Sequence, residues 1–163
     1  MAQRGRPRNF DRSDALRHAQ RVFWELGYDG ARVADLQKAM GGITAPSFYA
    51  AFGSKEDLFR EVIALHCNTD GLAVQRAITE GATARASIED MLRAAVRAYS
   101  QPGKPRGCLL APSAVNCSEE SRAIQEYVRH LRMQRPQVIR VRLERGVAGR
   151  IVIRDGSPTL PLF

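Results

Sequence analysis

The chain has 163 residues, and 25 Lys+Arg against 17 Asp+Glu leave a formal net charge of +8 at pH 7. A chain of this length can bury the core of one compact domain without disulfides or metal, and its 44% of hydrophobic residues exclude a disordered polybasic protein. It contains no apolar run long enough to span a membrane and no secretory signal, so we expect a cytoplasmic protein with no membrane partner.

Residues 1–9 are expected to form a basic, flexible arm. They hold Arg4, Arg6 and Arg8 and no acidic residue, and Pro7 excludes a regular helix. The Arg-Gly-Arg-Pro sequence is typical of arms that place arginines in the narrow minor groove of A·T-rich DNA. Any short basic tail shares this composition, so the arm by itself is a weak indication of a DNA partner.

The next segment predicts two helices. Asp11 is positioned to cap the first, whose apolar face recurs at helical spacing up to Leu26, and Gly27 is expected to end it. A second, shorter apolar pattern runs from residue 33 to 40 and stops at two consecutive glycines, 41 and 42. We expect these apolar side chains to form the core.

A third and a fourth helix follow the two glycines. Thr44 can cap the third, and Pro46 is tolerated in its first turn because the amide it lacks has no helical partner there. Gly53 ends this helix, and Ser54 begins the fourth with the spacing of a capping box, which apolar residues continue to about position 74 or 78. Two short helices joined by a glycine turn, after a supporting helix and a basic arm, are typical of a helix-turn-helix DNA reader.

Five short segments between residues 10 and 66 carry a family signature. They are Phe23-Trp24-Glu25-Leu26-Gly27-Tyr28, Val33-Ala34-Asp35-Leu36, Gly42-Ile43-Thr44, Ser47-Phe48-Tyr49 and Phe52-Gly53-Ser54-Lys55-Glu56-Asp57-Leu58-Phe59. Together they resemble the DNA-binding region of the TetR family of bacterial transcriptional regulators. The resemblance implies an all-α fold, in which a three-helix DNA-binding domain at 10–66, with its helix-turn-helix at about 32–52, precedes a helical effector-binding and dimerisation region at 67–163.

The resemblance also implies which residues contact DNA. The third helix enters the major groove with its first turn toward the bases, while hydroxyl groups near that turn reach phosphates. Lys55 places a positive charge in the first turn of the fourth helix, where it opposes the helix dipole and needs a compensating anion. A DNA phosphate would supply that anion, and the neighbouring acids at 56 and 57 are the structural alternative. Arg32 stands where the family often has a hydroxyl cap, and we expect it to contact phosphate. The expected DNA-binding residues are Arg4, Arg6, Arg8, Arg32, Thr44, Ala45, Pro46, Ser47, Tyr49 and Lys55.

The region from residue 67 onward predicts further helices. Ser87 is expected to cap one that ends near Tyr99. Ser118-Glu119-Glu120 begins a long one that Pro136 kinks or splits, with its arginines on a solvated face. Beyond Gly149 we expect an extended piece and a turn. TetR proteins usually continue through two more helices that build the dimer interface, so the resemblance implies that this chain lacks its last helices and that a homodimer must use other surfaces or fail to form.

Cys108 and Cys117 are interpreted as small buried thiols rather than as redox or electrophile sensors, because no neighbour in the sequence obviously lowers their pKa. The three cysteines show no metal-ligand spacing and the three histidines lie far apart. We therefore expect no metal site and no cofactor.

These patterns favour a sequence-specific transcriptional regulator, expected to be a ligand-responsive repressor. Its partners would be a double-stranded DNA operator, a small-molecule effector and a second copy of the chain. The alternative is an architectural protein that binds the minor groove through the arm and has no effector. An enzyme is not expected, because no nucleophile–base pair, metal-ligand spacing or phosphate-binding glycine loop is visible.

Overall fold

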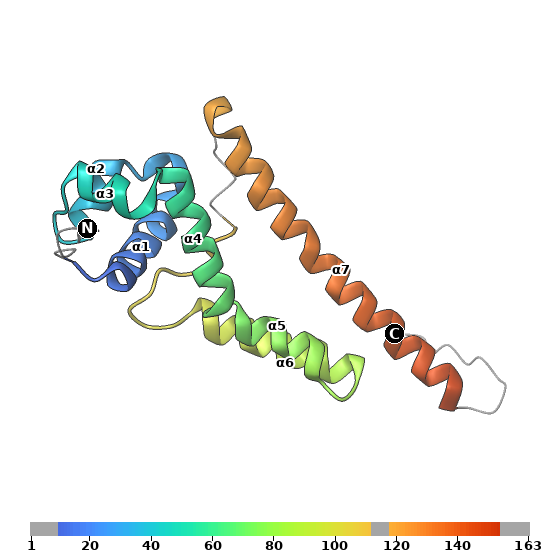
Figure 1. The fold of residues 1–163 in the computed structure, drawn as a ribbon. Helices are drawn as coiled ribbons and strands as arrows, with labels where there is room; N and C mark the ends of the chain where they lie inside the picture. The colour runs from blue at the N-terminus through green and yellow to red at the C-terminus, as the bar shows by residue number, and fades with distance from the viewer. Residues whose placement is uncertain (1–9, 112–117, 154–163) are drawn as a thin grey trace, which may run out of the picture.

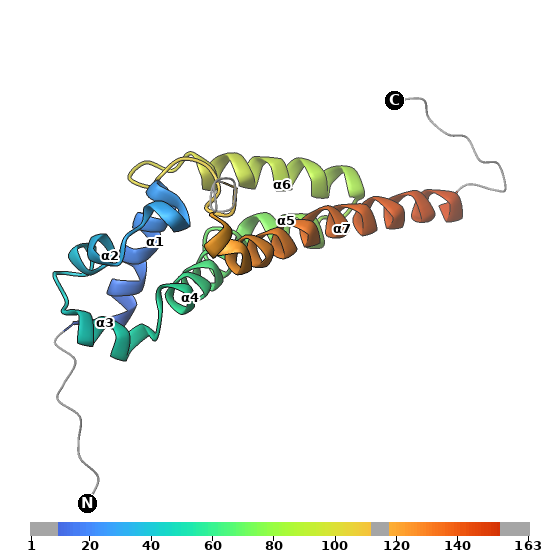
Figure 2. The same cartoon turned by 90° about the horizontal axis from the view of Figure 1, so that it is seen from above.

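The computed structural model describes residues 10–111 and 118–153, and only the backbone of 150–153. Within these residues the fold is all-α, as predicted, and contains no strand. The elements are α1 (Arg12–Gly30), α2 (Val33–Ala39), α3 (Ala45–Phe52), α4 (Lys55–Asn68), α5 (Leu72–Glu80), α6 (Ala84–Tyr99), the 3-10 helix η2 (Glu119–Ser121) and α7 (Arg122–Ile153). Helices α1 to α3 gather at one end of the molecule, and α4 leads from them to α5, α6 and α7 (Figures 1 and 2).

Helix α1 begins as predicted but does not end at Gly27. The Asp11 carboxylate accepts a hydrogen bond of 2.9 Å from the Asp14 backbone amide, which is the expected cap. Gly27 adopts φ 71° and ψ −179°, a conformation essentially restricted to glycine. The helix therefore changes direction at Gly27 and resumes to Gly30.

An aromatic core joins α1, α3 and α4. The rings of Phe23 and Phe59 meet edge to face at 5.0 Å between centroids, and Phe48 lies 5.8 Å from Phe52. All four side chains are buried. Because burial of each phenylalanine contributes about 1.5–3 kcal/mol, this core fixes one face of α3 and leaves the opposite face exposed.

The fourth helix is shorter than predicted. It ends at Asn68, and a separate helix, α5, begins at Leu72. Buried Gly71 lies in the connecting turn, where an added Cβ would come within 3.3 Å of the Cys67 and His66 backbones. Apolar spacing continues across this turn, so the sequence pattern did not reveal the break.

Helix α6 begins earlier than predicted, and Ser87 is not its cap. Thr83 caps it by accepting a hydrogen bond of 3.1 Å from the Ala86 amide. Ser87 is buried one turn later, where its hydroxyl accepts a hydrogen bond of 2.8 Å from Arg142 Nε. The role of Ser87 thus depends on a residue of α7.

Helix α7 is one continuous helix of 32 residues, so the predicted kink or split at Pro136 is wrong (Figure 1). Pro136 is exposed, and the carbonyl that loses its partner can be hydrated there. The helix also includes residues 150–153, which were predicted to be extended. Most α7 arginines are exposed as expected, but Arg135 and Arg142 are partly buried. No helix in the described ranges is both long and apolar enough to cross a membrane.

Candidate nucleic-acid interface

The turn between α2 and α3 depends on two glycines. Gly41 and Gly42 have φ values of 86° and 75°, the left-handed region that side chains disfavour. A Cβ at either position would meet no atom within 4 Å, so backbone conformation rather than space requires glycine. The Gly42 amide donates to the Gln37 carbonyl at 2.9 Å and closes the turn.

Arg32 precedes the first residue of helix α2, which has no hydroxyl cap, as the sequence indicated. The Asp35 carboxylate instead accepts a hydrogen bond of 3.2 Å from the Arg32 backbone amide. The Arg32 side chain is exposed. Lys38, exposed in the last turn of α2, adds a cation next to the glycine turn, and sequence reasoning did not single it out.

The start of α3 presents an exposed polar turn. Thr44 caps the helix by accepting from the Ser47 amide at 3.4 Å, and its hydroxyl donates to Ser47 Oγ at 3.0 Å. Thr44, Ala45, Pro46 and Ser47 are all exposed. Amides at the start of a helix and the positive end of its dipole favour an anion such as phosphate.

Tyr49 and Lys55 extend this surface in different ways. The Tyr49 ring packs edge-on against buried Phe48 at 5.3 Å, yet the residue remains 50% exposed. Lys55 is partly buried, and its Nζ lies 4.3 Å from the centre of the Tyr28 ring. Tyr28 was not predicted as part of the site; it directly follows the kink at Gly27 and also packs on Phe59.

The structure thus describes seven of the ten predicted DNA-binding residues. Five of them run from Thr44 to Tyr49 at the start of α3, Lys55 begins α4 and Arg32 precedes α2. Arg4, Arg6 and Arg8 lie outside the described residues. Figure 2 shows α3 at one end of the molecule, opposite the end that the last turns of α7 reach.

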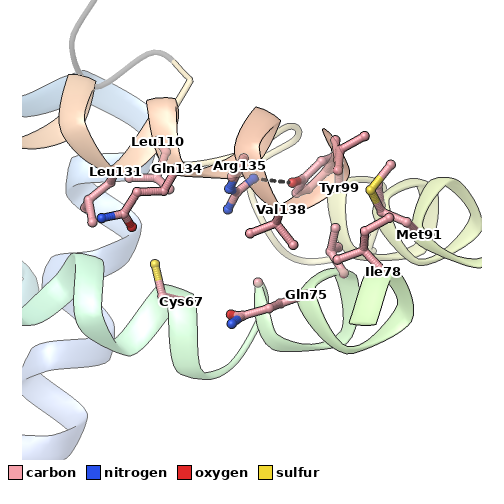
Figure 3. Close-up of a pocket in the computed structure, with 14 residues that line it drawn as sticks. Cys67, Gln75, Ile78, Met91, Tyr99, Leu110, Leu131, Gln134, Arg135 and Val138 are labelled. Atoms are coloured by element: carbon pink, nitrogen blue, oxygen red, sulfur yellow. Dashed lines mark hydrogen bonds between the residues drawn. The ribbon is translucent and has the colours of Figure 1, made fainter. Parts of the chain in front are cut away.

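A cavity of about 350 Å³ lies between α4, α5, α6 and α7 (Figure 3). Its walls combine apolar side chains such as Ile78 and Val138 with a few polar groups, among them Arg135 and Tyr99. Arg135 Nη1 donates to the Tyr99 hydroxyl at 3.3 Å. Sequence reasoning left the effector site unknown, because the lining residues come from elements that are distant in sequence.

Cys108, which was predicted to be a small buried thiol, lies beside this cavity. It is partly buried. Burial alone would raise its pKa, but hydrogen bonds from His66 and the Leu110 backbone and the charge of Arg135 lower the pKa of this thiol from 9.0 to about 7. The sequence does not reveal these neighbours, because His66 and Arg135 are distant from Cys108 along the chain. Cys117 lies outside the described residues.

The sequence is similar to those of bacterial regulatory proteins. The family model described as "Bacterial regulatory proteins, tetR family" matches residues 15–62. The chain is 32% identical to the HTH-type transcriptional repressor ComR of Escherichia coli (strain K12) over 72% of this chain and 56% of ComR. It is also 32% identical to the repressor BdcR of the same strain, over 76% of this chain and 63% of BdcR. The chain therefore spans about three fifths of the length of these curated relatives.

A solved structure covers more of the chain. It is a cysteine mutant of the TetR family transcriptional regulator CifR, complexed with 26 bp double-strand operator DNA. The two proteins are 38% identical and superpose with a TM-score of 0.84 over 93% of this chain and 79% of that chain. The similarity thus extends well beyond the helix-turn-helix.

Proposed function

The chain belongs to the TetR family of bacterial regulatory proteins, and we propose on that basis that it is a transcriptional repressor that binds operator DNA as a homodimer. The observation that carries the proposal is the exposed start of α3, from Thr44 to Tyr49, held on a buried aromatic core after the glycine turn. Residues 10–66 would act as the DNA-binding domain and the remainder as the effector-binding and dimerisation region. Regulation of chromosomal DNA in the cytoplasm, rather than catalysis, would be its role.

The chemistry of α3 indicates how DNA would be recognised. Residues 44–52 contain no Arg, Lys, Asn or Gln, so the helix offers no bidentate contact to guanine or adenine. Ala45 can contact a thymine methyl group, and Ser47 can adapt to several bases. Affinity would therefore depend largely on phosphate contacts, and specificity on DNA shape and on two half-sites about 34–36 Å apart.

Helix α4 would couple a small-molecule effector to DNA. Lys55 begins this helix beside the proposed DNA surface, and Cys67 near its other end lines the cavity. The cavity volume of about 350 Å³ lies within the range of small-molecule sites, roughly 300–1,000 Å³. An effector that binds best when α4 is displaced would change the separation of the two α3 helices and so weaken DNA binding.

The substitution Ala45→Glu distinguishes a loss of DNA binding from a loss of folding stability. A carboxylate in the first turn of α3 should leave stability unchanged or raise it by about 0.3–1 kcal/mol through the helix dipole. The same charge would face DNA phosphates, so we expect affinity for duplexes selected from a random pool to fall at least about 30-fold, or 2 kcal/mol. Fluorescence anisotropy and thermal unfolding measure the two effects.

Ala73→Glu is the matched control, because Ala73 is exposed in the first turn of α5. This variant should retain DNA binding. Equal loss in both variants would contradict the assignment of α3 to the groove. Binding that survives Ala45→Glu but disappears when Arg4, Arg6 and Arg8 are neutralised would instead support the architectural minor-groove alternative.

A further inference from the structure

A cluster of polar side chains surrounds Cys108 next to the cavity. Cys108 Sγ lies 3.8 Å from His66 Nε2 on α4 and 3.9 Å from Arg135 Nη1 on α7. The loop after α6 brings the thiol there: Gly107 has φ 87°, and its amide donates to the Tyr99 carbonyl at 3.0 Å. Segments that are 27 and 42 residues apart from Cys108 thus meet at one sulfur atom.

His66 is the second unusual member of this cluster. It is fully buried, and its Nδ1 has no hydrogen-bond partner within the described structure. That nitrogen lies 3.6 Å from Asp70 Oδ2, and Lys104 Nζ donates to Asp70 Oδ1 at 2.5 Å. The thiol and the imidazole are therefore a neighbouring pair, the arrangement of a nucleophile and its base. The Asp70 carboxylate lies near the far side of the ring but beyond hydrogen-bond distance of Nδ1.

The charged and titratable groups around the thiol favour its ionised form. Arg135 contributes positive charge from α7, and the Tyr99 hydroxyl of α6 also stabilises the thiolate. Cys67 on α4 behaves differently, because burial raises the pKa of its thiol. At neutral pH about half of Cys108 would be thiolate, whereas Cys67 would remain protonated.

A small molecule has access to this sulfur. A second hollow of about 280 Å³ is bordered by Cys108 and shares Leu110, Arg135 and Ile139 with the cavity of Figure 3. Arg135, which contacts both Cys108 and Tyr99, is therefore placed to donate to a polar atom of a molecule lying in either space.

We propose that Cys108 is a covalent sensing site for soft electrophiles of the α,β-unsaturated carbonyl class, and that the adduct weakens DNA binding. The regulatory part rests on the proposed function. His66 takes the thiol proton, and the thiolate sulfur adds to the β-carbon of the alkene. As the new C–S bond forms, the π electrons move to the carbonyl oxygen, where Arg135 donates a hydrogen bond to the enolate. The proton returns from His66 to the α-carbon, so the thioether product contains every atom of both reactants.

The position of His66 explains how an adduct would reach the DNA-binding domain. The His66 ring packs edge to face on Trp24 of α1 at 4.9 Å between centroids. A substituent on Cys108 would displace its sulfur from His66 and occupy space between α4 and α7. Because packed interiors adjust by discrete shifts, this change would move α4 relative to α1.

Reaction of the full chain with 2-cyclohexen-1-one tests the chemistry. We expect one adduct by intact mass, mapped to Cys108 by peptide mass spectrometry, absent in Cys108→Ser and retained in Cys67→Ser and Cys117→Ser. At pH 7 a thiol of pKa about 7 has about 50 times the thiolate of one at 9.0, and its lower intrinsic nucleophilicity reduces this advantage to roughly 6-fold. The rate should level off above about pH 8. A rate that rises steadily to pH 9, or adducts on the other cysteines first, would overturn the proposal.

Arg135→Met tests the positioning of the thiolate and the enolate. It should shift the midpoint of the rate profile to higher pH, an effect that loss of packing alone would not produce, and an unchanged midpoint would refute this role.

Anisotropy with a selected duplex tests regulation: the adduct should lower affinity at least about 10-fold in the parent chain and not in treated Cys108→Ser. An adduct that leaves affinity unchanged would overturn the regulatory part. A parent chain that binds no duplex at all would refute the proposed function, while peptide mapping would still decide the chemistry.

Discussion

Two glycines of α1 should respond in opposite directions to the same substitution. At Gly27 an added Cβ meets nothing within 4 Å, but φ 71° and ψ −179° strain any residue that has a side chain. Such strain lowers the free energy of unfolding by about 1–3 kcal/mol. Alanine offsets about 0.4–1 kcal/mol of this loss because it makes the unfolded chain less flexible. Gly30 has no positive φ, and its Cβ would make an ordinary 3.5 Å contact with Leu26. We therefore expect Gly27→Ala to destabilise by about 1.5 kcal/mol and Gly30→Ala to stabilise by about 0.4–1.

Urea unfolding and thermal melts measure both variants. For a chain of this size 1 kcal/mol corresponds to about 2–4 °C in Tm, so the two alanine variants should differ by roughly 4–10 °C. Unchanged urea m-values would show that the unfolded state is comparable in all three proteins. Equal effects of the two substitutions, or a stabilised Gly27→Ala, would refute the claim that glycine is required for the kink.

Two further substitutions test contacts between elements, and a third tests the interior of α7. Burial would raise the pKa of Asp29, but hydrogen bonds from Ser121 and Ser118 lower it below the ordinary value of 3.8. The ionised carboxylate therefore stabilises the fold fully above pH 3.8, and this stability is lost as pH falls through the lower pKa of the folded state. Asp29→Asn should be less stable than the parent chain at pH 7, and pH-dependent unfolding should show the difference narrowing below pH 3.8. Arg12→Met removes a pair with Glu61 that is about one-third exposed and should cost about 1 kcal/mol in urea unfolding, less in about 1 M salt. Pro136→Ala restores a helical amide and should slow hydrogen exchange in the centre of α7.

The helix starts at residues 10–66 were predictable because their signals are local. Asp11, Thr44 and Ser54 each cap the helix that follows through a bond to an amide three residues on, and such spacing is visible in the sequence. The exposed start of α3 follows from the same rule once Phe48 is assigned to the core.

The errors occur where a distant partner decides the structure. Ser87 is a residue type that often caps helices, but its hydroxyl accepts a hydrogen bond from Arg142, which lies 55 residues away in the sequence. Cys108 looks inert in the sequence because His66 and Arg135 approach it only in the folded chain. The break before Leu72 was missed because apolar periodicity continues across it.

Helix α7 makes hydrogen bonds to the rest of the molecule near both of its ends as well as at Arg135. Before its first turn, Asp29 of α1 accepts from the Ser118 amide at 2.5 Å, and towards its other end Arg142 Nη2 donates to the Gly81 carbonyl at 2.7 Å. Arg135 lies between these two end contacts. A helix of 32 residues is about 48 Å long, so a displacement at Arg135 that rotates α7 about one end contact also shifts the other. We therefore expect a ligand that displaces Arg135 at the cavity to move the end of α1 through α7, without any change inside α2 or α3.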